Sequence, residues 1–154
     1  MLDHKWIGHT FAPYTRKIEK GQLWFFAKAI GETNPIFTDE KAAKAAGYPA
    51  LPAPPTFGFS LSNAQTDTFS YIKEMGVPLE VLLHGEEAFE YFQPILAGDE
   101  ITLQRTVLEI YEKKGGLLEF EKIETSMTNQ QQEVVGKMQT TSVVRHDLQS
   151  NADC

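Results

Sequence analysis

Two short stretches of the chain carry residue types that acid–base chemistry needs. Glu32 supplies a carboxylate and Asn34 supplies an amide, two residues apart and just before a proline. A carboxylate can take or give a proton, and an amide can orient a water molecule. The second stretch, residues 56–58, precedes an apolar pattern of helical spacing. Its backbone N–H groups would lie at a helix start, where they can stabilise a developing negative charge.

Turn chemistry alone also explains the first stretch. Gly31 follows an apolar stripe of helical spacing and is typical of a residue that ends a helix in the left-handed conformation. The stripe consists of Leu23, Phe26, Ala27 and Ile30. Asn34-Pro35 is typical of a turn. From the residues alone, helix punctuation therefore remains an alternative to a functional site.

His84 is the histidine nearest the middle of the chain. It could complete an acid–base pair with Glu32, within one chain or across a dimer, although a solvated or turn-capping histidine is the more common case. The histidines lack ligand spacing and no cysteine cluster occurs, so we expect no metal. The sequence also has no phosphate loop, dinucleotide fingerprint or Gly-x-Ser-x-Gly elbow, so we expect no cofactor.

The elements that must position these residues follow from periodicity and turn signals. The pattern predicts an extended segment over 11–19, a helix over 21–30, a short helix over 39–46 with Thr38 as N-cap, and a long helix from 57 to 75. Strands are predicted over 84–93, 100–111, 117–128 and 133–145, with bulges where alternation fails. They would form an antiparallel meander, giving an α+β domain with the long helix against the sheet.

The long helix carries polar residues on more than its outer face. These are Ser60, Ser62, Asn63, Gln65, Thr66, Asp67 and Ser70. A helix wholly enclosed by a sheet would not tolerate so many polar side chains. We therefore expect part of it to face solvent, a partner subunit or a substrate channel.

Length and charge limit the classes of protein to which this chain can belong. The 154 residues predict one domain over 1–148 and a disordered tail over 149–154. A net charge of −7 argues against nucleic-acid binding. No apolar run has membrane length, and no signal-peptide core follows Met1, so we expect no membrane association and a cytoplasmic location. The one cysteine, Cys154, fits a reducing compartment.

The motif Gly31-Glu32-x-Asn34-Pro35-Ile36 resembles the signature of the MaoC-like, (R)-specific enoyl-thioester hydratase and dehydratase family, Gly-Asp-x-Asn-Pro-aliphatic-His. Thr56-Phe57-Gly58-Phe59 and Tyr91-x-x-Pro94-x-x-Ala97-Gly98-Asp99 also lie where that family has similar residues. The resemblance covers most of the chain and is closest to the FAS1-like dehydratase branch. It implies a hot-dog fold, a long central helix wrapped by a curved antiparallel sheet, with ligand at the interface of two such units.

The chain departs from the family at both acid–base positions. Glu32 replaces the family aspartate, and Phe37 replaces the histidine, whose task a phenyl ring cannot perform. The resemblance implies Glu32, Asn34 and, as a substitute for the lost histidine, His84 as catalytic candidates. It implies these substrate-binding candidates: Phe37, Pro55, Thr56, Phe57 and Gly58. The prolines just before the helix have no N–H to donate to a thioester oxyanion.

The resemblance implies an acyl-CoA or acyl-carrier-protein thioester as ligand, undergoing (R)-3-hydroxyacyl dehydration or trans-2-enoyl hydration. Surface cations for the pantetheine phosphates are available at Lys41, Lys44, Arg105, Lys113 and Lys114. With the acid–base pair incomplete, we favour a substrate-binding unit in a heterodimer with a catalytic MaoC-like partner. The alternatives are a self-sufficient homo-oligomeric hydratase that uses Glu32, a non-catalytic acyl-thioester binding module, and a hot-dog thioesterase.

Overall fold

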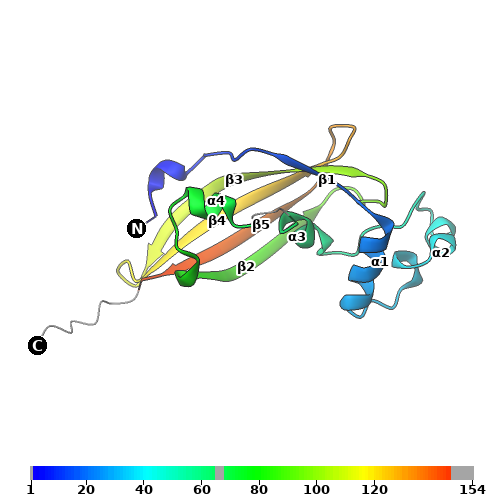
Figure 1. Cartoon of the computed structure of the whole chain (residues 1–154), viewed down its shortest axis with the longest axis horizontal. Helices are drawn as coiled ribbons and strands as arrows, with labels where there is room; N and C mark the ends of the chain where they lie inside the picture. Colours follow the sequence, from blue (N-terminus) through cyan, green and yellow to red (C-terminus); the bar gives the residue numbers. More distant parts are fainter. Residues whose placement is uncertain (1, 65–67, 147–154) are drawn as a thin grey trace, which may run out of the picture.

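The computed structural model describes residues 2–64 and 68–146 (Figure 1). Its helices are α1 (Lys20–Ala29), α2 (Glu40–Ala45), α3 (Phe57–Ser62) and α4 (Ser70–Glu74), with short 3-10 turns at His4–Trp6, Pro35–Phe37 and Leu79–Val81. Its strands are β1 (Tyr14–Lys17), β2 (Leu82–Tyr91), β3 (Glu100–Lys113), β4 (Leu118–Thr128) and β5 (Val134–Arg145). The expected tail over 149–154 lies outside the described residues.

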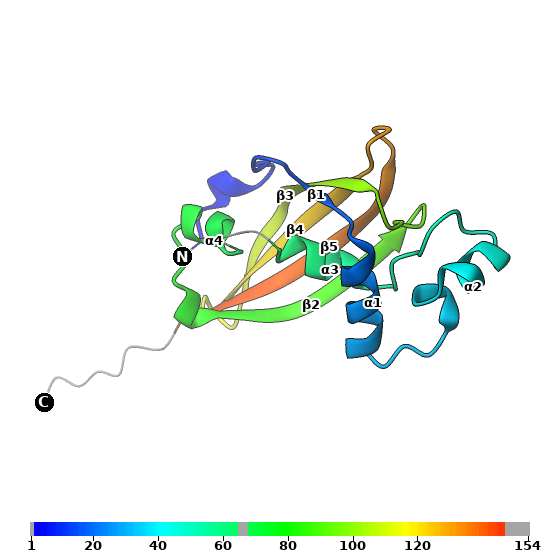
Figure 2. The ribbon, with the colours of Figure 1, turned by 45° about the vertical axis from the view of Figure 1, so that its right-hand side comes forward.

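The five strands form one antiparallel sheet in the order β1-β3-β4-β5-β2. The meander prediction is right for β3, β4 and β5 and wrong for β2, which crosses to pair with β5 at the far edge. Figure 2 shows the sheet curving past α3, with α1 and α2 together at one end of the molecule. The register shift between Met127 and Thr128 skips Val135, where the alternation of β5 fails, and confirms a predicted bulge there. Two further shifts lie beside His84 and Val107.

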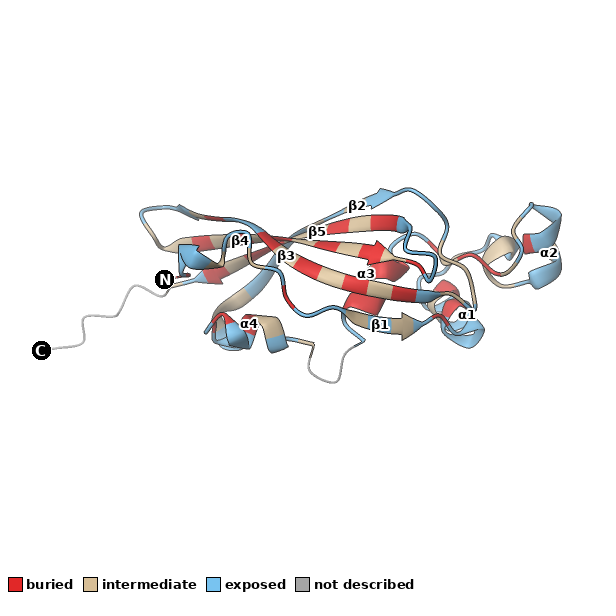
Figure 3. Cartoon of the chain, turned by 90° about the horizontal axis from the view of Figure 1, so that it is seen from above, coloured by how far each residue is buried: buried red, intermediate tan, exposed pale blue. Residues whose placement is uncertain are grey.

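Strand alternation decides which face of the sheet is buried. Along β4 the buried and half-buried residues alternate without a break, as the banding in Figure 3 shows. The buried set forms two hydrophobic clusters. One packs Phe57 and Leu61 of α3 against Leu103, Met127 and Met138. The other packs Ile72 and Met75 against Val107, Ile123 and Val144.

The predicted long helix is wrong, because the chain leaves helical geometry after Ser62 and α4 begins only at Ser70. The Ser62 carbonyl accepts hydrogen bonds from Arg105 Nη2 at 2.6 Å and from the Tyr14 hydroxyl at 3.0 Å. In a continuous helix that carbonyl would bond an amide four residues on. Side-chain donors from two strands therefore take the place of the helical hydrogen bond, and α3 ends.

The ends of α1 and α2 largely follow the sequence signals. Gly31 has φ 72° and Gly47 has φ 92°, as expected for glycines that follow helices. Thr38 is not the N-cap of α2. The cap is Asp39, whose carboxylate accepts a 2.8 Å hydrogen bond from the Lys41 amide.

Candidate functional site

A cavity of about 400 Å³ lies where the loop before α3 meets the end of β2. Its lining is mainly apolar and includes Phe37, Pro55, Thr56, Gly58, Tyr91 and Met127. We call it the first cavity. The structure thus brings four of the five substrate-binding candidates to one place. The fifth, Phe57, is buried in the core with its ring edge-on to Phe26, at 5.3 Å between centroids.

The backbone at the start of α3 is held in an unusual conformation. Thr56 has φ 74°, the left-handed region that β-branched residues rarely adopt. Its amide donates to the Tyr91 hydroxyl at 3.1 Å, and the Phe57 amide donates to the Pro54 carbonyl at 3.1 Å. Neither amide is therefore available to a ligand in this arrangement. The Gly58 amide has no backbone acceptor among the described residues, and Gly58 lines the cavity.

Thr56→Gly is expected to stabilise the chain by about 1 kcal/mol. Glycine removes the left-handed strain of roughly 1–2 kcal/mol, less its greater unfolded-state entropy, and the Thr56 side chain makes no capping hydrogen bond that would be lost. Urea unfolding measures the change. Thr38→Gly, at φ −132°, is the matched control and should destabilise instead. A loss of stability in both variants would show that Thr56 is unstrained.

Glu32 and Asn34 both hold the turn that follows α1. The Glu32 carboxylate accepts a 2.8 Å hydrogen bond from the backbone N–H of Asn34. The side-chain Oδ1 of Asn34 accepts one from the backbone N–H of Ile36 at 3.2 Å. Glu32 is half-buried and Asn34 is exposed, and neither lines the first cavity. Their contacts are those of turn residues, while Phe37, in the 3-10 turn that Asn34 caps, does reach the cavity wall.

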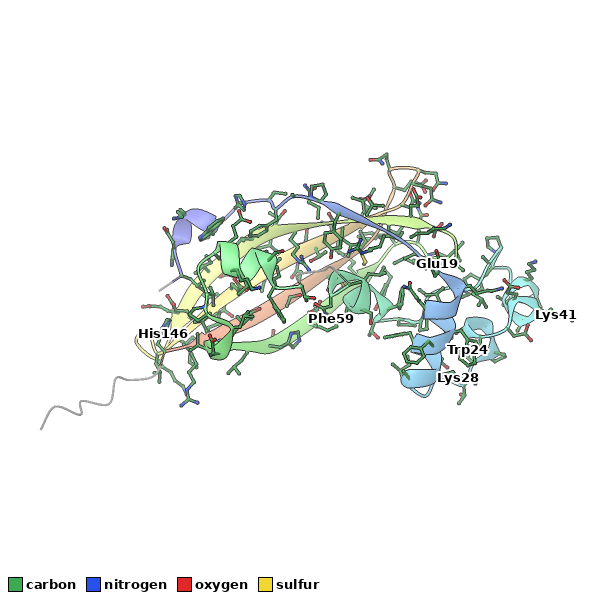
Figure 4. All side chains as sticks on the ribbon, in the orientation of Figure 1. Glu19, Trp24, Lys28, Lys41, Phe59 and His146 are labelled. Carbon is green, nitrogen blue, oxygen red and sulfur yellow. The ribbon has the colours of Figure 1, made fainter. Side chains whose placement is uncertain are left out.

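His84 lies apart from this turn, on β2. Its exposed ring packs edge-on against Phe59 at 5.6 Å between centroids. It lines another cavity of about 550 Å³, which we call the second cavity. Figure 4 shows Phe59 near the middle of the molecule, away from Trp24 and Lys28 of α1. Glu32 lines neither the first nor the second cavity, whereas His84 lines the second, and their pairing across a dimer stays a prediction.

Sequence reasoning missed a set of buried polar residues on the sheet face beneath α3 and α4. Arg105, expected among surface cations, is 7% exposed, and Glu121 is fully buried. Burial raises the pKa of Glu121 to about 7 and the pKa of Tyr71 to about 12, and it also raises the pKa of Glu87. The signal was present, because Arg105 continues the buried alternation of Leu103 and its neighbours.

Over 2–64 and 68–146, no group of three or more His, Cys, Asp or Glu side chains is placed to hold a metal ion. No helix within those ranges is long and apolar enough to cross a membrane.

A curved antiparallel sheet that packs against helices, with an apolar cavity beside the start of α3, defines the MaoC-like hot-dog class of hydratases and dehydratases. Within it, the chain belongs to the family described as FAS1-like, dehydratase domain region, whose model matches residues 5–138. A UPF0336 protein of Streptomyces coelicolor is 34% identical over 117 residues, covering 74% of this chain and 77% of the relative.

Two solved structures share the fold at similar identity. The HadBC (3R-hydroxyacyl-ACP dehydratase) complex of Mycobacterium tuberculosis matches with a TM-score of 0.76 and 25% identity, covering 90% of this chain and 96% of that one. A MaoC-like dehydratase matches with a TM-score of 0.80 and 26% identity, covering 91% of this chain and 42% of that one. This chain therefore spans less than half of the second protein. These similarities confirm the expected hot-dog fold and MaoC-like resemblance.

Proposed function

We propose that the chain is the substrate-binding unit of an (R)-3-hydroxyacyl-thioester dehydratase or trans-2-enoyl-thioester hydratase, acting in the cytoplasm with a catalytic MaoC-like partner. The observation that carries this proposal is the state of the two acid–base positions. Phe37, at the histidine position of the family motif, lines the apolar first cavity. Glu32, at the aspartate position, accepts a hydrogen bond on its carboxylate from the backbone N–H of Asn34.

The first cavity suits the acyl part of a thioester. Its lining is mainly apolar, and Met127 and Val135 of the sheet form part of its wall. The Gly58 amide is the donor that remains for the thioester carbonyl. The partner would supply the carboxylate and histidine that hold water, since general acid–base catalysis needs groups that can exchange protons.

The comparisons support a two-unit arrangement. The similar Mycobacterium tuberculosis structure is a HadBC complex described as a 3R-hydroxyacyl-ACP dehydratase. The similar MaoC-like dehydratase has a chain more than twice as long as the part that this chain matches. Dimerisation through a sheet edge would also cover its unpaired backbone groups. The partner in a dimer would be either a catalytic MaoC-like chain or a second copy of this chain.

The test is hydration of trans-2-octenoyl-CoA by the purified chain, alone and mixed with a MaoC-like chain that carries Gly-Asp-x-Asn-Pro-aliphatic-His. We expect no turnover from the chain alone. The mixture should exceed the summed separate rates by about 100-fold, because this chain would bind the acyl group and orient the thioester for the partner's acid–base groups. Glu32→Ala and His84→Ala should leave the rate of the mixture within about twofold of wild type, because the partner carries the chemistry.

Three outcomes would identify a different function. Turnover by the chain alone that disappears in Glu32→Ala would place the acid–base work here and support the self-sufficient homodimer. Acyl-thioester binding without turnover in any mixture would identify a binding module. Release of free thiol from octanoyl-CoA would identify a thioesterase.

A further inference from the structure

The second cavity combines apolar walls with an inward-facing polar set. It lies across α3 from the first cavity, since Gly58 lines the first and Phe59 and Ser62 line the second. Its apolar lining includes Phe59, Leu79, Leu82 and Ile123. Its polar lining includes Arg105, Thr125, Thr140 and Ser142. A cavity of about 550 Å³ with this division suits an amphipathic ligand.

Arg105 is the main charged group of this cavity. The residue is 7% exposed, and its guanidinium donates to the Ser62 carbonyl at 2.6 Å and lies 4.5 Å from the centroid of the Tyr71 ring. Among the described residues it forms no ion pair with Asp or Glu. A guanidinium has five N–H donors, so most remain for another acceptor. A buried cation without a counter-ion is costly, which favours an anion beside it.

The buried carboxyl group of Glu121, on the same sheet face, does not meet this need, because Glu121 pairs with Ile110 in the register of β3 and β4, whereas Arg105 pairs with Thr125. Both Glu121 carboxylate oxygens are enclosed, and the side chain placed to donate to them is Ser142, which pairs with Glu121 in the register of β4 and β5. Burial raises the pKa of Glu121 to about 7, so much of it is uncharged near neutral pH. The Thr125 hydroxyl adds a neutral donor beside Arg105, because Thr125 is buried, lines the second cavity and pairs with Arg105 in the register of β3 and β4.

We propose that the second cavity binds a carboxylate at the end of a short aliphatic chain. Arg105 pairs with the carboxylate, the Thr125 hydroxyl donates to it, and the aliphatic part packs on Phe59 and Ile123. Dehydration of a hydroxyacyl thioester does not require a carboxylate on the acyl chain, so this site goes beyond the proposed function. Two sources carry the same chemistry: a free medium-chain fatty acid and an acyl thioester whose far end is a carboxylate.

Isothermal titration of the chain with octanoate and with 1-octanol tests the site without any catalytic partner or turnover. Octanoate should bind about 10-fold or more tightly than octanol, because a charge-assisted hydrogen bond separates the two probes. Arg105→Gln should weaken octanoate binding by about 10-fold or more and leave octanol binding unchanged. Equal binding of the two probes, or no octanoate binding, would overturn the proposal.

Arg16→Gln is the matched control, because Arg16 and Arg105 both lie over the Tyr14 ring and both donate to a backbone carbonyl, but Arg16 lines neither cavity. It should bind octanoate like wild type. Thr125→Val removes one buried hydroxyl at nearly constant shape and should weaken octanoate binding about threefold or more. That variant decides the matter if Arg105→Gln does not fold. Equal losses in Arg16→Gln and Arg105→Gln would contradict a role for the cavity.

The CoA thioester of octanedioic acid separates the two sources. If the far end of an acyl thioester is the ligand, this ester should bind more tightly than both octanoate and octanoyl-CoA, and Arg105→Gln should abolish the difference. If a free fatty acid is the ligand, octanoate should bind more tightly than the ester. Both results support a carboxylate site and differ only in its source.

Discussion

Between pH 5 and pH 8, the Glu121→Gln variant is expected to lose far less stability than the wild-type chain. Burial raises the pKa of Glu121 from 4.5 to about 7 in the folded state. The folded chain therefore holds this proton more tightly than the unfolded chain. Its stabilisation is fully present below about pH 4.5 and is lost as the pH rises through about 7. The shift corresponds to about 3 kcal/mol, whereas a glutamine stays neutral throughout.

Urea unfolding at pH 5, 6, 7 and 8 measures this difference. Glu87, whose pKa burial also raises, will leave a smaller slope of the same sign in Glu121→Gln. The control is Glu112→Gln, an exposed position on β3, which should follow the wild-type curve. Parallel curves for wild type and Glu121→Gln would show that Glu121 does not carry the pH dependence.

The strands could be predicted because residues close together in sequence, through their alternation and their turns, determine where each strand lies. Every second residue of β4 is buried, and the turn glycine Gly98 has the positive φ its position requires. The break between α3 and α4 could not be predicted in this way. It depends on the Ser62 carbonyl meeting donors from Tyr14 and Arg105, which are 48 and 43 residues away in sequence. Sequence polarity near Asn63 indicated an unusual helix but not where it ends.

The candidate site also contains features that the sequence predicted and features that it could not predict. Motif resemblance selected Phe37 and Thr56, and the structure brings both to the first cavity. The resemblance could not show that the Thr56 amide already donates to the Tyr91 hydroxyl, because that contact depends on how β2 pairs at the far edge of the sheet. Arg105 was misplaced for a different reason. Its charge suggested an exposed position, whereas its place in the alternation of β3 indicated the buried face of the sheet. The structure places Arg105 on the buried face.

The Ala53→Trp variant is expected to weaken binding of octanoyl-CoA by about 100-fold. Ala53 lines the first cavity and packs against the hydrophobic cluster around α3. Its amide is bonded to the Ile95 carbonyl at 2.7 Å, so the backbone at this position is fixed. An indole there should displace three or four methylene groups of the acyl chain, at roughly 0.8 kcal/mol each, or about 3 kcal/mol in total.

Isothermal titration with octanoyl-CoA measures the loss, and urea unfolding checks that the variant is folded. Ala45→Trp is the matched control, because Ala45 is exposed on α2 and lines neither cavity. It should bind octanoyl-CoA like wild type. Wild-type affinity in Ala53→Trp would place the acyl chain outside the first cavity and remove the structural basis of the proposed substrate-binding unit. A 100-fold loss confined to Ala53→Trp would place the acyl chain beside Phe37, where the family motif has its histidine.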